Sequence, residues 1–551
     1  MSPSYELTES QRYSERIDDI PLLLAHIERM GLSDTLDAHL PPSGESGISS
    51  GMLAAVWITH LLSQSDQKQR HIANWAAARA ETLRRCVRQP IAQTDLQASR
   101  LRNILTGLSH DAVWSAIEID LSRQIIAQYS LNLDTIRITS RDESDWSLSP
   151  DGLIQIVNGR SGYSGGHQLH IEHALVEPLG LPIATSVSAH RSAIDAERTA
   201  LIAHEVAGAT PLHVVGHSAE REVVRASIQA RGGVYLCELG ARKTEAVAPI
   251  GATQREYART PLSLWGMGGR QELIGEGYEY QVPIEVQLHG KELCWQERRF
   301  VIRSHSLLRQ QEAQLRGRVG RARAELAALS TPRRGKRRPQ TIEAFTPIIA
   351  EILAEHRVEA LIDVSFDEQV TERMVRRYGG RPTGIRIARD VRVVPSVNER
   401  AVEQAVEDLG WQSFVTNMTG DLSIELSRAL ESLQPPSFAE RVRGRAVSLP
   451  PGVLQYKEFA IGLVRLMSLM VRTLVLLDHL IDRNLRDETA ARAAPDRLRG
   501  FGSVGERLLD AFRDVQLQGG ANGGVVTTPL NALQRRALQM VLLPVETYHS
   551  L

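Results

Sequence analysis

The sequence has few cysteines, and their spacing suggests no shared role. Only three occur in 551 residues, Cys86, Cys237 and Cys294, and they lie far apart in the chain. This scarcity excludes a disulfide scaffold and a cysteine zinc site, and it is typical of a protein in a reducing compartment. A cytoplasmic location is therefore expected.

The chain also lacks a signal pattern and an uninterrupted apolar run. Its first residues, MSPSYELTES, do not combine a basic start with an apolar stretch. The most apolar segment, Ala460 to Leu480, is interrupted by Arg465, Arg472 and Asp478. This pattern predicts a buried helix, and no membrane partner is expected.

A strong net charge is missing too, because the formal charge of the chain is −1. The charge is unevenly distributed, however. The stretch from Arg298 to Arg338 contains thirteen Lys or Arg and two Glu, so it carries +11 and the rest of the chain −12. Such a stretch can neutralise nucleic-acid phosphates. A solvated basic helix followed by a linker is the competing interpretation.

The periodicity of apolar residues divides the chain into segments. Helical patterns fill the N-terminal part, strand alternation begins near Asp134, and strands then alternate with helices, which predicts a mixed α/β core. The expected segments are a helical domain (1–130), the first part of the core (131–240), an insertion with β-hairpins and an Arg-rich helix at 306–329 (241–420), a C-terminal helical part of the core (421–515), and a flexible linker and tail (516–551).

Several short motifs follow one another along the chain. They are Ile17 to Leu24 with Met30-Gly31-Leu32, Gly162-Tyr163-Ser164 with His167, Glu177 to Pro182, Leu409-Gly410-Trp411 with Phe414 to Asn417, and Arg443-Gly444-Arg445. In this collinear order, over nearly its whole length, the chain resembles the DDE-type insertion-sequence transposases. The resemblance implies an α/β fold with a ribonuclease H-like mixed-sheet core, a helical N-terminal domain and a β-containing insertion domain.

That family holds two divalent cations with three carboxylates, and the resemblance assigns these acids to three positions of this chain. The positions fall on Thr139, His217 and Pro436. Mg²⁺ and Mn²⁺ require hard oxygen ligands, for which threonine, histidine and proline are poor or impossible substitutes. A degenerate active site is therefore expected, with no cofactor, and with Mg²⁺ only if activity is retained.

Neighbouring acids could restore the chemistry by displacement. Asp142, Glu143 and Asp145 lie just beyond the expected end of the first strand, and Glu440 lies one helical turn beyond Pro436. Solvated loop carboxylates are the favoured interpretation of all four. Whether the chain is an enzyme is therefore left open by its sequence.

Two other chemistries have weaker support in the sequence. Five histidines cluster in the expected core strands: His167, His170, His173, His213 and His217. A zinc or nickel site is disfavoured, because strand alternation places His170 on the opposite face from its two neighbours. Ser164 lies in a Gly-x-Ser-x-Gly sequence, but the strand–turn–helix context of a nucleophile elbow is missing.

The function that the resemblance favours is DNA binding without strand cleavage. The expected phosphate contacts are Arg316, Arg318, Arg321, Arg323, Arg333, Arg334, Lys336, Arg337 and Arg338. DNA is the expected partner, and a homodimer is compatible with the resemblance. Two alternatives stay open: an active transposase that transfers DNA strands with displaced carboxylates, and a regulatory or interaction protein that binds no DNA.

Overall fold

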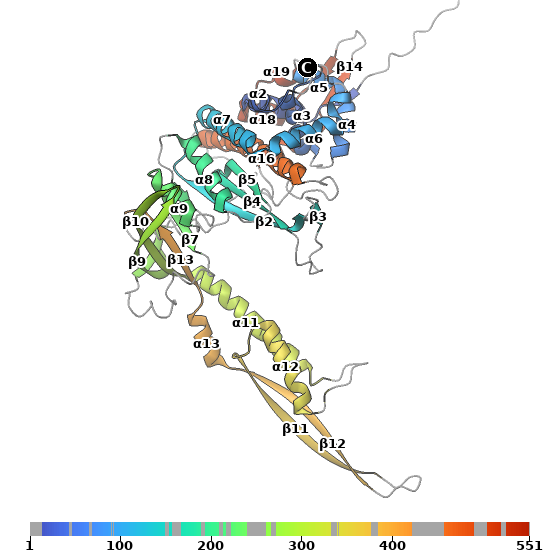
Figure 1. The fold of residues 1–551 in the computed structure, drawn as a ribbon. Coiled ribbons are helices and arrows are strands. Elements are labelled where there is room, and N and C mark those ends of the chain that lie inside the picture. Colours follow the sequence, from blue (N-terminus) through green and yellow to red (C-terminus); the bar gives the residue numbers. More distant parts are fainter. Residues whose placement is uncertain are drawn as a thin grey trace, which may run out of the picture.

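The structure is a computed structural model of the 551-residue chain (Figure 1). It describes residues 14–42, 47–64, 69–89, 91, 93–148, 154–156, 167–188, 193–208, 213–215, 222–239, 260–265, 271–331, 339, 341–375, 384–420, 457–489, 504–519 and 525–549.

The N-terminal part of the chain forms a helical domain. Its elements are α1 (Ile20–Arg29), α2 (Leu32–His39), α3 (Ser50–Gln64), α4 (Gln69–Ala77), α5 (Ala80–Val87), the 3₁₀ turn η1 (Gln93–Leu96), α6 (Ala98–Ser109) and α7 (Asp111–Tyr129). Helix α3 is apolar around most of its circumference and is buried from Leu53 to Leu61, as expected for a helix at the centre of a bundle. Gly51 lets α3 approach α2 closely, because a Cβ there would overlap the carbonyl oxygen of Ser33.

Residues 136–239 supply one half of a mixed sheet. The elements are β2 (Ile136–Leu148), β3 (Ile154–Ile156), β4 (His167–Val176), β5 (Leu181–Ser188), α8 (Ala193–Ala207), β6 (His213–Val215), α9 (Glu222–Ala230) and β7 (Val234–Leu239). The strand order is β5-β4-β2-β6-β7. Strand β4 runs antiparallel to both of its neighbours, β5 and β2, whereas β6 runs parallel to β2 and β7 runs parallel to β6. The mixed α/β class expected from the sequence is confirmed.

The same sheet continues through strands that the sequence assigned to a separate insertion. They are β8 (Thr260–Trp265), β9 (Gln271–Leu288), β10 (Lys291–Ser304) and β13 (Trp411–Thr416). They extend the order as β7-β13-β10-β9-β8 in antiparallel pairs. The expected boundaries at residues 240 and 420 therefore do not separate two sheets. Pairing of β13 with β7 makes one continuous sheet, and Phe300 and Phe414 are buried along it.

A buried polar cluster joins the two halves of the sheet. Glu297 of β10 is 0% exposed and accepts hydrogen bonds from Arg225 Nε of α9 at 2.7 Å and from Tyr235 Oη of β7 at 2.8 Å. Trp295 Nε1 in turn donates to Tyr235 Oη over 2.8 Å. Burial and the neighbouring Glu297 raise the pKa of Tyr235, so its hydroxyl keeps the proton that it donates.

An arm projects from the sheet (Figure 1). It consists of α11 (His305–Ala328), α12 (Ile342–His356), β11 (Ile362–Val375), β12 (Gly384–Val397) and α13 (Glu399–Glu407). Thr341 and Asn398 cap α12 and α13, because their side chains accept hydrogen bonds from Ala344 N and Ala401 N. The Arg-rich helix expected at 306–329 is observed one residue earlier in the chain.

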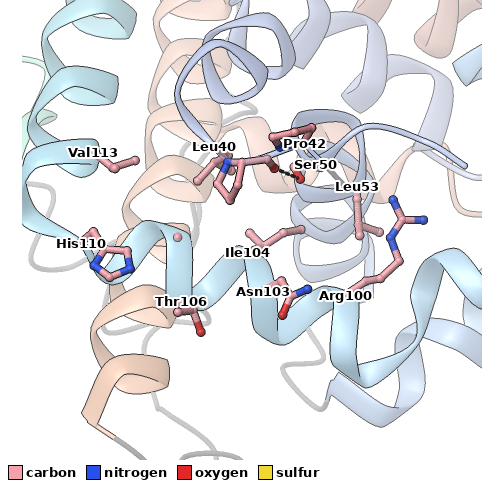
Figure 2. Close-up of a pocket in the computed structure, with 12 residues that line it drawn as sticks. Leu40, Pro42, Ser50, Leu53, Arg100, Asn103, Ile104, Thr106, His110 and Val113 are labelled. Atoms are coloured by element: carbon pink, nitrogen blue, oxygen red, sulfur yellow. Dashed lines mark hydrogen bonds between the residues drawn. The ribbon is translucent and has the colours of Figure 1, made fainter. Parts of the chain in front are cut away.

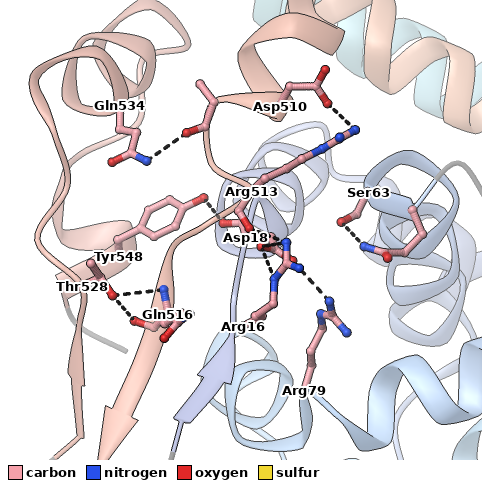
Figure 3. A network of polar contacts seen from close by, with 12 residues as sticks. Arg16, Asp18, Ser63, Arg79, Asp510, Arg513, Gln516, Thr528, Gln534 and Tyr548 are labelled. Carbon is pink, nitrogen blue, oxygen red and sulfur yellow. Dashed lines mark hydrogen bonds and ion pairs between the residues drawn. The ribbon is translucent and has the colours of Figure 1, made fainter.

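The C-terminal part returns to the helical domain. Its elements are α16 (Lys457–Thr489), α17 (Val504–Asp510), β14 (Gln516–Gly519), β15 (Val525–Thr527), α18 (Ala532–Met540) and α19 (Glu546–His549). The flexible linker and tail expected at 516–551 are wrong for the described residues. Strand β1 (Ser14–Arg16) pairs with β14, which pairs with β15, and Tyr548 is buried and donates from Oη to Asp18 O over 2.9 Å (Figure 3).

Helix α16 is the buried helix that the sequence predicts around Ala460 to Leu480. Its segment from Lys457 to Leu485 is long and apolar enough to cross a membrane by length and composition, and 94% of its most apolar window is buried inside the protein. It contacts α6 on one side and β5 on the other. Gly462 permits the first contact, because a Cβ there would overlap the carbonyl group of Leu105.

Candidate nucleic-acid interface and degenerate metal site

The position that the resemblance assigns to the first acid lies inside a central strand. Thr139 belongs to β2, and its side chain is half-buried. Its partner in the antiparallel pairing with β4 is His173. Directly paired residues project from the same face of a sheet, so a hydroxyl and an imidazole stand side by side at this position.

Hydrogen bonds connect His173 to the helices that cover the sheet. His173 Nδ1 lies 3.1 Å from Thr185 Oγ1 on β5, and Thr185 Oγ1 lies 2.8 Å from Ser468 Oγ on α16. Trp114 of α7 donates from Nε1 to Thr185 O over 2.8 Å. Because Thr185 and Ser468 are buried, this face of the sheet is fixed in position by both α7 and α16.

The same two helices share a buried ion pair. Arg472 Nη2 lies 2.7 Å from Glu118 Oε1, and both side chains are 0% exposed. Burial raises the pKa of Glu118 to about 7, although Arg472 opposes the shift. Burial also lowers the pKa of Arg472. Both shifts have the same cause, because loss of water disfavours the charged form of each partner.

A second group of charges joins α7, α8 and α16. Asp111 lies 2.5 Å from Arg465 Nη2 and 2.6 Å from Arg198 Nη1. The guanidinium carbons of Arg465 and Arg472 lie 5.6 and 5.9 Å from the ring centre of Trp114, within the range of cation–π attraction. These charges are paired within the protein, so they stabilise the arrangement of the helices over the sheet.

The acids expected beyond the first strand lie within it, which corrects the sequence expectation. Strand β2 continues to Leu148, and Asp142 and Glu143 pair with His170 and Leu169 of β4. The predicted strand was too short because the prediction relied on the alternation of apolar side chains. The long partner strand β4 also forms backbone pairs with polar residues of β2, which this alternation does not reveal. Three of the expected residues lie outside the described part of the chain: His217 and Pro436, which the resemblance assigns to the other two acids, and Glu440, the remaining candidate for a displaced acid.

The histidines follow the alternation of β4. His170 is buried, and half-buried His173 lies on the opposite face. The side chains of His167 and His213, and the whole of Ser164, lie outside the described residues. Within the described part of the chain, no group of three His, Cys, Asp or Glu side chains is arranged to hold a metal ion.

Helix α11 carries the described part of the proposed phosphate contacts. Arg316, Arg321 and Arg323 are exposed and Arg318 is half-buried. The opposite side of the helix packs into the arm through Leu315, Val319, Ala322 and Leu326. Arg316 is partly neutralised, because its Nε lies 2.9 Å from Glu312 Oε1.

Other arginines of the basic stretch are used inside the protein. Arg298 Nε lies 2.5 Å from Glu279 Oε1, and Arg303 Nε donates to Leu409 O over 3.1 Å. Five further expected contacts lie outside the described residues: Arg333, Arg334, Lys336, Arg337 and Arg338. The positive charge available to a ligand is therefore smaller than the count over 298–338 suggests.

A pocket of about 500 Å³ lies in the helical domain, between α6 and the adjoining ends of α2 and α3 (Figure 2). Apolar side chains such as Leu53 and Ile104 line it, with Arg100 and His110 among the polar groups. Arg100 forms an ion pair with Asp95, so its charge is already neutralised. The pocket therefore shows no chemistry that selects a class of ligand.

Sequence reasoning missed two groups of residues. One is the buried cluster around Glu297, which gives no clear signal in the sequence because Gln296 and Arg298 flank the acid. The other is a second basic segment at 373–389, which contains six Arg and no Asp or Glu. Charge counting over a window of this length would have found it, but it is separated from the first basic stretch by an acidic region.

The described residues thus define a mixed α/β protein with a helical domain, a continuous sheet and a projecting arm. In comparisons with known proteins, no family model matches the sequence and no curated protein matches it significantly.

Proposed function

We propose that the chain is a relative of the DDE-type insertion-sequence transposases that has lost its metal-binding acids and binds duplex DNA without cutting it. The observation that carries the proposal is Thr139 on the central strand β2, where the resemblance calls for an aspartate. The proposal rests on three further supports: the strand order, the chemistry of the donors at this position, and the arginines of the arm.

The strand order supports a ribonuclease H-like core. That fold has three antiparallel strands followed in the chain by two strands, each preceded by a helix, that run parallel to the first. Strands β2, β4 and β5 are antiparallel and precede α8, β6, α9 and β7, and β6 and β7 continue the sheet in parallel beyond β2. The arm and the strands β8 to β13 then correspond to the insertion that the resemblance implies.

The register of the sheet supports the assignment of the first two acid positions. Ile136 pairs with Val214 and Arg137 with Val215, a constant offset of 78 residues. Strand β2, which carries Thr139, is therefore a direct neighbour of β6, the strand after which the resemblance places the second acid position. His217 itself lies outside the described residues.

The donors at this position do not fit a two-metal site. Two divalent cations need several carboxylate oxygens, which Mg²⁺ prefers strongly over hydroxyl and imidazole groups. Thr139 supplies a hydroxyl and His173 an imidazole whose Nδ1 is bonded to Thr185. These donors therefore support no catalytic step at a metal, and the activity that we propose is binding.

Binding to DNA is proposed to use the arm. Arg318, Arg321 and Arg323 lie on α11, on the part of the arm that projects from the sheet (Figure 1). Arginines on phosphates supply affinity that does not depend on sequence and that weakens as salt displaces the protein. The net charge of −1 for the whole chain requires such a local surface.

The test measures binding and cutting in the same tubes. Fluorescence anisotropy of a mixed duplex library is recorded at several salt concentrations with Mg²⁺, and a supercoiled plasmid reports nicking. Binding that weakens steeply with salt and leaves the plasmid intact supports the proposal. Metal-dependent nicking would overturn it in favour of an active transposase with displaced acids such as Asp142 or Glu143. Absence of DNA binding, with a complex in gel filtration, would favour the interaction protein or homodimer.

A further inference from the structure

The arm leaves and re-enters the sheet at one point. Arg303 at the end of β10 pairs with Trp411 at the start of β13, and Ser304 N donates to Gly410 O over 2.9 Å. Gly410 has φ +83, and a Cβ there would lie 2.8 Å from Leu308 Cβ. Residues 305–410 are therefore inserted between two paired strands, and their direction is set at this narrow neck.

The arm has a hydrophobic core of its own. This core contains Leu315, Val319, Ala322 and Leu326 of α11, Phe345, Ile349 and Ile352 of α12, Val358, Leu361, Ile362 of β11, Val391 and Val393 of β12, and Val402 of α13. Ser330 further fixes β12, because Val393 N donates to Ser330 Oγ over 2.8 Å. One end of the β11–β12 ribbon is therefore held firmly against the helices.

The other end of the ribbon extends past this core. Phe366 and Val393 are paired, and Phe366 packs against the arm's core. Pairing continues to Val375 and Gly384, which is about 30 Å further along at the usual rise of a strand. Val370 in this part is 56% exposed. An isolated two-stranded ribbon is only marginally stable in water, so this extension gains little from the protein's own contacts.

Charge changes sign along the ribbon. The half that adjoins the helices carries four acids and one arginine: Asp363, Asp367 and Glu368 on β11, and Asp390 and Arg392 on β12. The distal half carries Arg373 on β11 and Arg386 and Arg389 on β12, with Glu372 as its acid. These arginines belong to the segment 373–389 that contains six Arg and no acid.

The backbone register pairs two arginine positions at the distal end. Arg373 and Arg386 are direct partners in the antiparallel pairing. Like charges directly opposite one another destabilise a sheet, and an anion bound nearby removes that cost. The pairing therefore favours an anionic partner over a neutral or cationic one.

We propose that the distal half of the ribbon, residues 370–375 with 384–389, is a DNA-binding surface that enters a groove of the duplex and places its arginines on phosphates. The major groove is about 12 Å wide and admits a two-stranded β-ribbon. The proximal acids keep the phosphate backbone away from the other half. This inference rests on the proposed DNA binding and names a surface that is separate from helix α11.

The test compares two triple variants of the full chain. Arg373→Gln/Arg386→Gln/Arg389→Gln alters the ribbon, and Arg318→Gln/Arg321→Gln/Arg323→Gln alters the helix with the same change of charge. If each ribbon arginine contacts one phosphate, the slope of log affinity against log salt becomes shallower by about 2.7. The Arg→Lys version of the ribbon variant keeps the charge and should retain most of the slope. Circular dichroism checks that each variant is folded.

The outcomes separate this inference from the proposed function. A shallower slope for the ribbon variant, restored by lysine, supports it. An unchanged slope for the ribbon variant with DNA binding intact overturns the inference and leaves the proposed function standing. Failure of the unaltered chain to bind DNA overturns both. Equal binding of single-stranded RNA and duplex DNA, with no protection of guanine N7 in the major groove, also contradicts groove entry.

Discussion

The buried pair of Glu118 and Arg472 gives a prediction about stability against pH. Burial raises the pKa of Glu118 to about 7 from its ordinary value of 4.5. The folded state therefore holds this proton more tightly than the unfolded state does. The stabilisation of the folded state by the protonated Glu118 is complete below about pH 4.5 and is lost as the pH rises through about 7. A shift of this size corresponds to a loss on the order of 3 kcal/mol across that window.

Glu118→Gln should remove this dependence. Glutamine keeps the shape of the side chain and an oxygen that accepts from Arg472, but it does not titrate. The difference in unfolding free energy between variant and original chain should therefore change by a few kcal/mol between pH 5 and pH 8, in favour of the variant at the higher pH. Urea unfolding followed by tryptophan fluorescence at each pH measures it.

The difference between variants isolates Glu118 from other titrating groups. Buried Asp19 has its pKa raised to about 6, mainly by burial, and contributes a slope of the same sign. Buried His26 has its pKa lowered to about 4, mainly by burial, and contributes the opposite slope, because the unfolded chain takes up that proton first. The exposed Glu355→Gln serves as the matched control. A difference curve for Glu118→Gln that is flat from pH 5 to pH 8 would refute the reasoning.

Three further predictions concern the neck, the sheet and the C-terminal segment. Gly410→Ala should lower the free energy of unfolding by about 1–3 kcal/mol, because Gly410 has a positive φ and a Cβ there would contact Leu308. Gly320 has open space around it, so Gly320→Ala should instead stabilise α11 by about 0.5–1 kcal/mol. Thermal melts of the two variants measure the difference. Tyr235→Phe removes one donor to buried Glu297 and should cost about 1–3 kcal/mol in urea unfolding. Removal of residues 520–551 takes away Tyr548, which stacks on Phe512 with ring centres 5.2 Å apart. The helical domain of the shortened chain should therefore be cleaved faster in limited proteolysis. An unchanged cleavage rate would contradict the packing described.

The elements that the sequence predicted best are those in which local pattern and burial agree. Helix α16 is recognisable because its apolar run is long, and its two buried arginines mark contacts with α7. The strand at Ile136 and Ile138 alternates cleanly because one face packs on the core. Thr139 could likewise be placed on a strand from its neighbours alone.

The elements that the sequence predicted poorly depend on distant partners. Strand β14 was assigned to a tail because its short segment stands beside a glycine-rich stretch, and only pairing with β1, about five hundred residues away, makes it a strand. The pairing of strand β13 was not predicted, because nothing in Trp411 to Thr416 indicates that its neighbours are β7 and β10. The charge available in the basic stretch could not be counted either, because Arg303 donates to the carbonyl of Leu409, which lies 106 residues further along the chain.

The proposed loss of metal-binding acids also bears on how the chain would bind DNA. A two-metal site collects carboxylates beside the phosphate backbone, so without its cations it repels the nucleic acid. Thr139 places a neutral hydroxyl at the first of these positions, next to His173 rather than a further acid. Repulsion at this position is therefore absent whether or not a divalent cation is present. Affinity for DNA should be the same in EDTA and in Mg²⁺ at matched ionic strength, whereas binding that requires Mg²⁺ would mean that acids elsewhere in the chain still form the site.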